Sequence, residues 1–95
     1  IFLGVIMVGN PEAEISSVSR ESAMAALQEI LRKNLRRGDI VTRFSQNIFA
    51  MLLTTVSYST GDLVMKRIEE MFYEEYHNKN IIVHHRISPL GTKVS

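Results

Sequence analysis

Two short, uninterrupted apolar runs constrain the fold of this 95-residue chain more than any other feature. The first covers residues 2–8 and ends at Gly9-Asn10-Pro11, and the second covers 48–53 with Thr54 as its last strand residue. Apolar runs of this length are typical of strands that are buried on both faces of a sheet. We therefore expect two central strands, at 2–8 and 48–54.

Two amphipathic helices are predicted, one after each apolar run. Apolar residues recur every three or four positions over 19–37, and Gly38 follows as the usual C-terminal stop. A second helix is predicted from Ser59, a hydroxyl N-cap with Asp62 three residues later, to about 76. The residues expected to face inward are Met24, Leu27, Ile30, Leu31 and Leu35 in the first helix, and Val64, Ile68, Met71, Phe72 and Tyr76 in the second.

The remaining strands, at 39–44 and 80–87, mix charged and β-branched residues. A short turn at 45–47 joins the first of them to the second apolar run, which predicts an antiparallel hairpin. The order is βαββαβ, the ferredoxin-like arrangement, in which the first and third strands are central. Charges on the other two suit exposed edges. We expect one α/β (α+β) domain over 1–95, with a four-stranded antiparallel sheet and two helices on one face.

Composition excludes several classes of function. The net charge of +1 gives no basic surface for nucleic acid. The absence of cysteine excludes disulfides, zinc ribbons and iron–sulfur clusters, and it fits a reducing compartment, so we expect a cytoplasmic protein without a cofactor. The opening apolar run is too short for a membrane span. Because the chain opens at Ile1 inside a strand, we expect it to be part of a longer protein.

Three histidines, His77, His84 and His85, raise the question of a metal site. Adjacent residues in a strand point to opposite faces, so the neighbouring pair cannot hold one ion through both rings. No carboxylate stands at a suitable spacing along the chain to complete a ligand set. We therefore expect edge or core histidines and no metal site.

The segment 31–44 resembles the run that precedes the signature hairpin of GGDEF (diguanylate cyclase) domains. It has the basic helix end, the Arg36-Arg37-Gly38-Asp39 turn and a strand ending in Arg43-Phe44. The resemblance extends from about 24 to 90 and implies a nucleotide cyclase-like fold. The five positions that correspond to the signature hold Ser45, Gln46, Asn47, Ile48 and Phe49.

The departures from the GGDEF pattern concern its chemistry. Ser45 and Gln46 replace glycines that let the backbone approach a nucleotide, and Asn47 and Ile48 replace carboxylates that help to hold magnesium. The first strand ends in Val8-Gly9-Asn10 without the metal-binding aspartate of the family. We therefore expect a degenerate, non-catalytic GGDEF-like domain.

A closer resemblance is to the C-terminal domain of SARP-like bacterial transcriptional activators, which carry a BTAD domain. It rests on four segments: residues 37–45, the apolar strand 48–53, residues 64–72 and residues 87–90. It implies a regulatory or protein-interaction domain whose partners are the other domains of the same regulator, with DNA bound by an upstream domain. A homodimer is compatible with this role, and no membrane contact is implied.

Arg36 and Asp39 offer an alternative function. They match the Arg-x-x-Asp inhibitory site at which GGDEF domains bind cyclic di-GMP, and a guanidinium and a carboxylate suit a guanine edge. The competing explanation is structural, because Arg36 is also a favourable cation at a helix C-terminus and Asp39 a common turn residue. A module that senses another small ligand also stays open.

Overall fold

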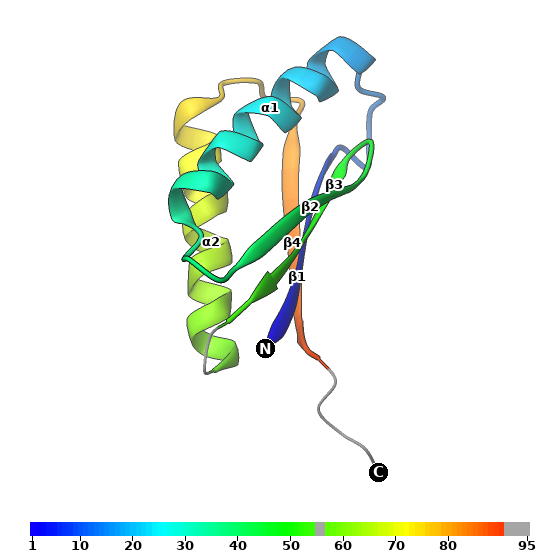
Figure 1. Cartoon of the computed structure of the whole chain (residues 1–95). Coiled ribbons are helices and arrows are strands. Elements are labelled where there is room, and N and C mark those ends of the chain that lie inside the picture. The colour runs from blue at the N-terminus through cyan, green and yellow to red at the C-terminus, as the bar shows by residue number, and fades with distance from the viewer. Residues whose placement is uncertain (55–56, 91–95) are drawn as a thin grey trace.

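The computed structural model describes residues 1–54 and 57–90. The elements are β1 (Phe2–Gly9), α1 (Ser17–Asn34), β2 (Ile40–Ser45), β3 (Ile48–Leu53), α2 (Tyr58–Glu75) and β4 (Ile82–Pro89). The strands form one antiparallel sheet in the order β2-β3-β1-β4, and both helices lie on the same side of it (Figure 1). The predicted ferredoxin-like fold, with the first and third strands in the centre, is confirmed.

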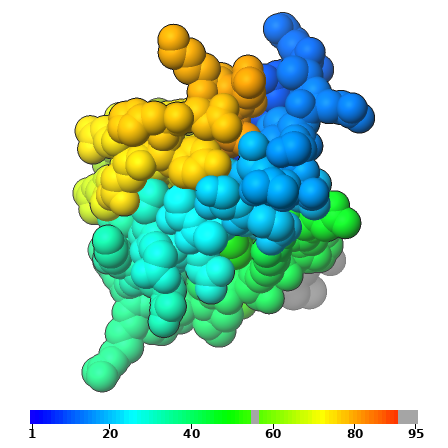
Figure 2. Space-filling view, turned by 90° about the horizontal axis from the view of Figure 1, so that it is seen from above, coloured from blue at the N-terminus to red at the C-terminus, as the bar shows by residue number. Residues whose placement is uncertain are grey.

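The hydrophobic core lies between the sheet and the two helices. Alternate residues of the central strands point into it, namely Ile6 and Val8 from β1 and Phe49, Met51 and Leu53 from β3. Six of the predicted inward residues are fully buried, and Leu35, Val64, Met71 and Tyr76 are partly buried against the same core. Seen from above, the first half of α1 lies between the end of α2 and the green strands of the hairpin (Figure 2).

The predicted bounds of α1 are wrong at both ends. The helix begins at Ser17, because the Ser16 hydroxyl accepts a hydrogen bond from the Ser19 amide at 3.1 Å and acts as N-cap. It ends at Asn34, where Leu35 adopts extended backbone. Gly38, with φ of 98°, serves a separate turn in which the Asp39 amide donates to the Arg36 carbonyl.

The start of α2 also differs from the prediction. Ser57, not Ser59, is the N-cap, since its hydroxyl accepts from the Thr60 amide at 3.2 Å. Asp62 therefore lies one turn inside the helix and is free to contact β4. The strand bounds shift less, by one or two residues: β2 starts and ends one residue late, and β4 runs to Pro89. The third strand, predicted over 48–54, ends at Leu53.

The prediction that the central strands are buried on both faces is wrong. Ile6 and Val8 are buried under the helices, but Met7, on the other face, is 39% exposed. On the same face of β1, Leu3 and Val5 are only partly covered. Within the ranges 1–54 and 57–90, no element packs on this side of the sheet (Figure 1). Neither of the two helices has the length and apolarity that crossing a membrane requires.

Gly4 of β1 packs closely against Met51 of β3 and Met65 of α2. A Cβ placed there would lie 3.1 Å from Met51 Cγ and 3.3 Å from Met65 Cε. Gly9, at the end of the same strand, has nothing within 4 Å of that position. We expect Gly4→Val to lower the free energy of unfolding by about 1–3 kcal/mol through overpacking. Urea denaturation of Gly4→Val and of the control Gly9→Val checks this. An equal effect of the two substitutions would contradict it.

Candidate functional site

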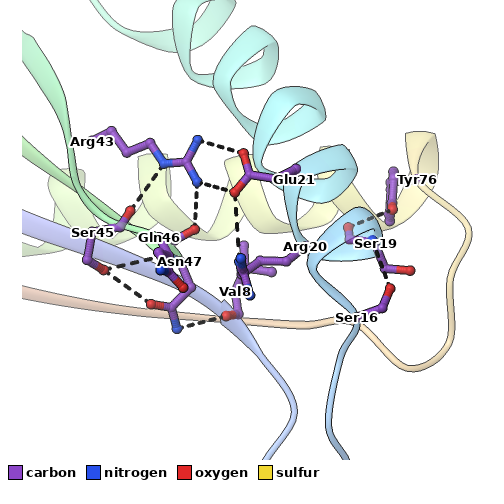
Figure 3. A network of polar contacts seen from close by, with 10 residues as sticks. All are labelled: Val8, Ser16, Ser19, Arg20, Glu21, Arg43, Ser45, Gln46, Asn47 and Tyr76. Carbon is purple, nitrogen blue, oxygen red and sulfur yellow. Dashed lines mark hydrogen bonds and ion pairs between the residues drawn. The ribbon is translucent and has the colours of Figure 1, made fainter.

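The hairpin that carries the five signature positions is tied to α1 by Arg43. Its guanidinium donates to both carboxylate oxygens of Glu21, at 3.0 and 2.7 Å, and also to the carbonyls of Ser45 and Gln46, at 3.2 and 2.8 Å (Figure 3). The hydrogen bonds from Arg43 lower the pKa of Glu21, and those to Glu21 raise the pKa of Arg43. A bidentate pair of this kind fixes the orientation of the turn.

Asn47 joins the same hairpin to the end of β1. The side-chain amide of Asn47 donates to the Val8 backbone carbonyl at 3.1 Å (Figure 3). The backbone carbonyl of Asn47 accepts from the Val8 backbone amide at 2.9 Å. The Ser45 hydroxyl lies 3.2 Å from the Asn47 side-chain oxygen. Ile48 and Phe49 belong to β3, Ile48 on the open face and Phe49 in the core, with 3% of its surface exposed. All five signature positions thus have structural contacts or burial within the domain.

A groove of about 360 Å³ lies between the hairpin and the connection from β1 to α1. Its polar lining residues are Asn10, Arg20, Gln46 and Asn47, and none of the eight residues that line it is acidic. Arg20 Nε is buried, has no hydrogen-bond partner within the described residues, and lies 3.8 Å from the Glu21 carboxylate. A groove with this lining suits an anion better than a divalent cation, which requires carboxylate oxygens.

Arg36 and Asp39, the residues of the alternative ligand site, are neighbours in one tight turn. One carboxylate oxygen of Asp39 accepts from the Thr54 amide and hydroxyl, at 2.9 and 2.8 Å, and the other accepts from the Arg36 amide at 2.8 Å. Burial acts to raise the pKa of Asp39, but these hydrogen bonds outweigh it, so the pKa lies below its ordinary value. Asp39 thus joins the end of α1 to the end of β3.

The cavity beside this turn is small. Arg36, Asp39 and Thr54 line about 20 Å³ of water-accessible space between α1, β3 and α2. That is room for roughly one water molecule, since one water needs about 10–15 Å³ on this measure. A nucleotide would have to bind outside it, on the exposed side of the turn, where the Asp39 oxygens already have partners. Cyclic di-GMP binding by this pair stays a prediction.

His85 is held between two carboxylates of α2. Its Nε2 lies 2.8 Å from Asp62 Oδ1, its Nδ1 contacts Glu69 Oε2, and its side chain is 14% exposed. Burial acts to lower the pKa of His85, but the two carboxylates outweigh it and raise the pKa. Asp62 also pairs with Lys66 at 3.2 Å, and its pKa is lowered by His85 and Lys66. The cluster ties α2 to the edge strand β4.

The histidines do not gather into one site. His84 points away from His85 and is exposed, as the alternation along a strand predicts, and His77 lies exposed beyond α2. Two carboxylates that are distant along the chain, Asp62 and Glu69, do contact His85. Because each of its ring nitrogens faces a different carboxylate, the three side chains share no point for an ion. Within the described ranges, no three His, Cys, Asp or Glu side chains are arranged to hold a metal.

Sequence reasoning missed Glu21, Arg20 and the partners of His85. Asp62, Lys66 and Glu69 are spaced as i, i+4 and i+7, which places them on one helix face and marks a charged stripe. That stripe could have predicted a polar contact on this face of the helix, although it does not identify the strand that makes the contact. Nothing along the chain links Glu21 to Arg43, which lies 22 residues away.

Comparisons with known proteins support the fold. A DGC (diguanylate cyclase) protein from Thermotoga maritima matches with a TM-score of 0.66 at 22% identity, over 94% of this chain and 66% of that protein. A de novo designed protein with a ferredoxin fold matches with a TM-score of 0.53 at 16% identity, over 100% and 92% of the two chains. No protein family and no curated protein sequence matches. The chain has a GGDEF-like, ferredoxin-like fold.

The contact of His85 with two carboxylates predicts a pH-dependent stability. Only the imidazolium has a proton on each ring nitrogen, so both contacts are hydrogen bonds only while His85 is charged. With a folded-state pKa above the unfolded value of about 6.5, the stabilisation is complete below that pH and is lost as pH rises through the raised pKa.

We therefore expect the free energy of unfolding to fall between pH 6 and pH 9 in the wild type and to change less in His85→Gln. Urea denaturation at several pH values measures this. His84→Gln, on the exposed side of the same strand, is the matched control. A wild-type slope that survives His85→Gln would disprove the role of His85.

Proposed function

We propose that this chain is a non-catalytic, degenerate GGDEF-like domain that serves as a regulatory or protein-interaction module of a SARP-like bacterial transcriptional activator. In this proposal DNA is bound by an upstream domain, and the partners of this domain are other parts of the same regulator or a second copy. A transcriptional role implies a cytoplasmic location.

The observation that carries the proposal is the lining of the groove beside the hairpin. Joining two nucleoside triphosphates requires magnesium at the phosphates, and magnesium in such sites is held by carboxylates. None of the residues that line this groove is acidic, and its charged residue is Arg20. Ile48, at a position where the family has a carboxylate, lies on the opposite face of the sheet from the core.

The contacts of the hairpin support the same proposal. Asn47 is hydrogen-bonded to β1, and the carbonyls of Ser45 and Gln46 accept from Arg43. A nucleotide that approached the backbone here would meet side chains where the family has glycines. The hairpin is therefore better suited to stabilise the domain than to bind a substrate.

The interaction role is supported by the uncovered face of the sheet. Ile40 is 58% exposed, Phe44 72% and Met7 39%, and all three belong to strands rather than loops. Apolar strand residues gathered on one face are a common mark of a surface that binds another protein. The assignment to a transcriptional activator rests on the resemblance of segments 37–45, 64–72 and 87–90.

A nucleotide-sensing module is the second candidate function. One observation favours it: the buried Arg20 Nε at the groove has no hydrogen-bond partner among the described residues. An anionic ligand in the groove could pair with the exposed part of the Arg20 guanidinium, and the side-chain amides of Asn10 and Gln46 could contact a phosphate or a base. This observation supports a ligand at the groove rather than at Arg36 and Asp39.

The proposal predicts no turnover of GTP. Incubation of the chain with GTP and Mg²⁺ or Mn²⁺, followed by chromatography of the nucleotides, should yield no cyclic di-GMP and no pyrophosphate release. An active diguanylate cyclase in the same buffer shows that the assay works. Cyclic di-GMP formed in proportion to the amount of this chain would refute a non-catalytic role.

A thermal shift measurement tests the second candidate and separates its two sites. Saturation with GTP, GDP or cyclic di-GMP should leave the melting temperature unchanged if the domain is purely an interaction module, since only ligands that bind the folded state raise it. A shift that Arg20→Ala removes and Arg36→Ala keeps would establish binding at the groove. The reverse result would establish the Arg36–Asp39 site.

A further inference from the structure

The outer edge of β4 is the longest regular edge of the sheet. β4 has eight residues that pair with β1 without a shift in register, whereas β2 has six residues and a bulge. A long, regular edge offers unpaired N–H and C=O groups to any extended chain, including another copy of the same protein. The charged residues His84 and Arg86 lie beside Met7 and Val5 on the uncovered face, so on the helix side the edge needs protection of another kind.

The backbone groups of β4 alternate between β1 and the outer edge. The Leu90 amide, just after the strand, donates to the Ile1 carbonyl, so the even-numbered residues face β1. The odd-numbered residues therefore direct their backbone groups outward, namely Val83, His85, Ile87 and Pro89. Because proline has no N–H, the last of these positions cannot donate a hydrogen bond to a further strand.

A side chain of α2 occupies the first outward position. The Tyr73 hydroxyl accepts a hydrogen bond from the Val83 amide at 2.8 Å and donates to the Val83 carbonyl at 3.4 Å. A residue of a fifth strand would form the same two hydrogen bonds with Val83. Since a neighbouring strand would run about 4.8 Å from β4, it cannot pair at Val83 while the hydroxyl is in place.

Tyr73 is held in this position by its own packing and by the contacts next to it. Its ring packs edge-on against the fully buried Phe72, with the ring centroids 5.7 Å apart. Asp62 and Glu69, on the same face of α2, contact His85, the next outward residue of β4. One stripe of α2 thus runs along the edge strand and keeps the Tyr73 hydroxyl beside Val83.

We propose that Tyr73 is an autoinhibitory contact that closes the β4 edge to strand addition. With Val83 covered and Pro89 without a donor, only His85 and Ile87 offer both an N–H and a C=O group. Release of Tyr73 lengthens the open edge from 85–87 to 83–87, which brings it to the usual strand length of about five residues. The inference goes beyond the proposed function and does not depend on it, because it states where a partner cannot extend the sheet.

Amide hydrogen exchange of the 95-residue chain tests the contact itself. In dilute wild-type protein the Val83 amide should exchange at least about tenfold more slowly than the outward amides of His85 and Ile87, which lack a partner within the described residues. Tyr73→Phe keeps the ring and removes the hydroxyl, so it should abolish this difference.

Tyr76→Phe is the matched control. The Tyr76 hydroxyl belongs to the C-cap residue of the same helix and donates to the Ser19 carbonyl at 3.3 Å, away from β4. Both variants lose one contact between a hydroxyl and the backbone, but only Tyr73→Phe uncovers the edge. Urea denaturation confirms that each variant is folded.

The concentration dependence of association tests the closure of the edge. In sedimentation equilibrium up to about 1 mM, Tyr73→Phe should associate at least about threefold more strongly than the wild type, because its open edge is longer. The amides of His85 and Ile87 should then exchange more slowly as the concentration rises, since a paired strand covers them. Association through the uncovered face would instead be equal in the wild type and both variants and would leave these amides unchanged.

Three results would overturn the proposal. The first is a Val83 amide that exchanges as fast as its outward neighbours in the wild type, or at the same rate in Tyr73→Phe as in the wild type. The second is a Tyr73→Phe chain that associates no more strongly than the wild type. The third is extra association that leaves the amides of His85 and Ile87 unprotected. The proposal stands if exchange and association both change in Tyr73→Phe and neither changes in Tyr76→Phe.

Discussion

The pairing of β1 with two neighbours at once is the constraint on which the rest of the domain depends. Its residues 2–7 pair with β3 and 2–9 with β4, so one register sets both halves of the sheet. A shift by one residue would turn Ile6 and Val8 out of the core and Met7 into it. That register also brings the hairpin to the end of β1, because it pairs Met7 with Ile48, the first residue of β3, and sets Asn47 of the turn beside Val8.

The candidate site follows from this register. Hydrogen bonds within the chain join the hairpin to the end of β1 and to α1, beside the groove. Asn47 bonds to Val8, and Arg43 bonds to the turn and to Glu21. Residues at the signature positions therefore contribute to the attachment of the hairpin.

The order of elements, the central and edge strands and most of the buried residues could be predicted from the sequence, because period-2 and period-3.6 patterns report directly on burial. Helix ends were less predictable. Ser16 and Ser19 are both possible N-caps by residue type, and only the geometry selects Ser16. Long-range polar contacts were not predictable, since the pairing of Arg43 with Glu21, or of His85 with Asp62, depends on helix placement over the sheet.

The failed prediction about β1 and β3 is the most informative of these differences. Their apolar sequences indicated two buried faces, and the described domain provides cover for one. The domain's own core does not account for the apolar residues on the uncovered face, because Leu3, Val5 and Met7 point away from the helices and are not buried in it. The two edge strands direct their arginines to opposite faces of the sheet. Arg43 of β2 lies on the helix side and contacts Glu21 of α1, whereas Arg86 of β4 lies on the uncovered side. The bulge in β2 and the charges of β4 thus protect the edges from pairing with other strands, and the apolar centre is left as the uncovered surface.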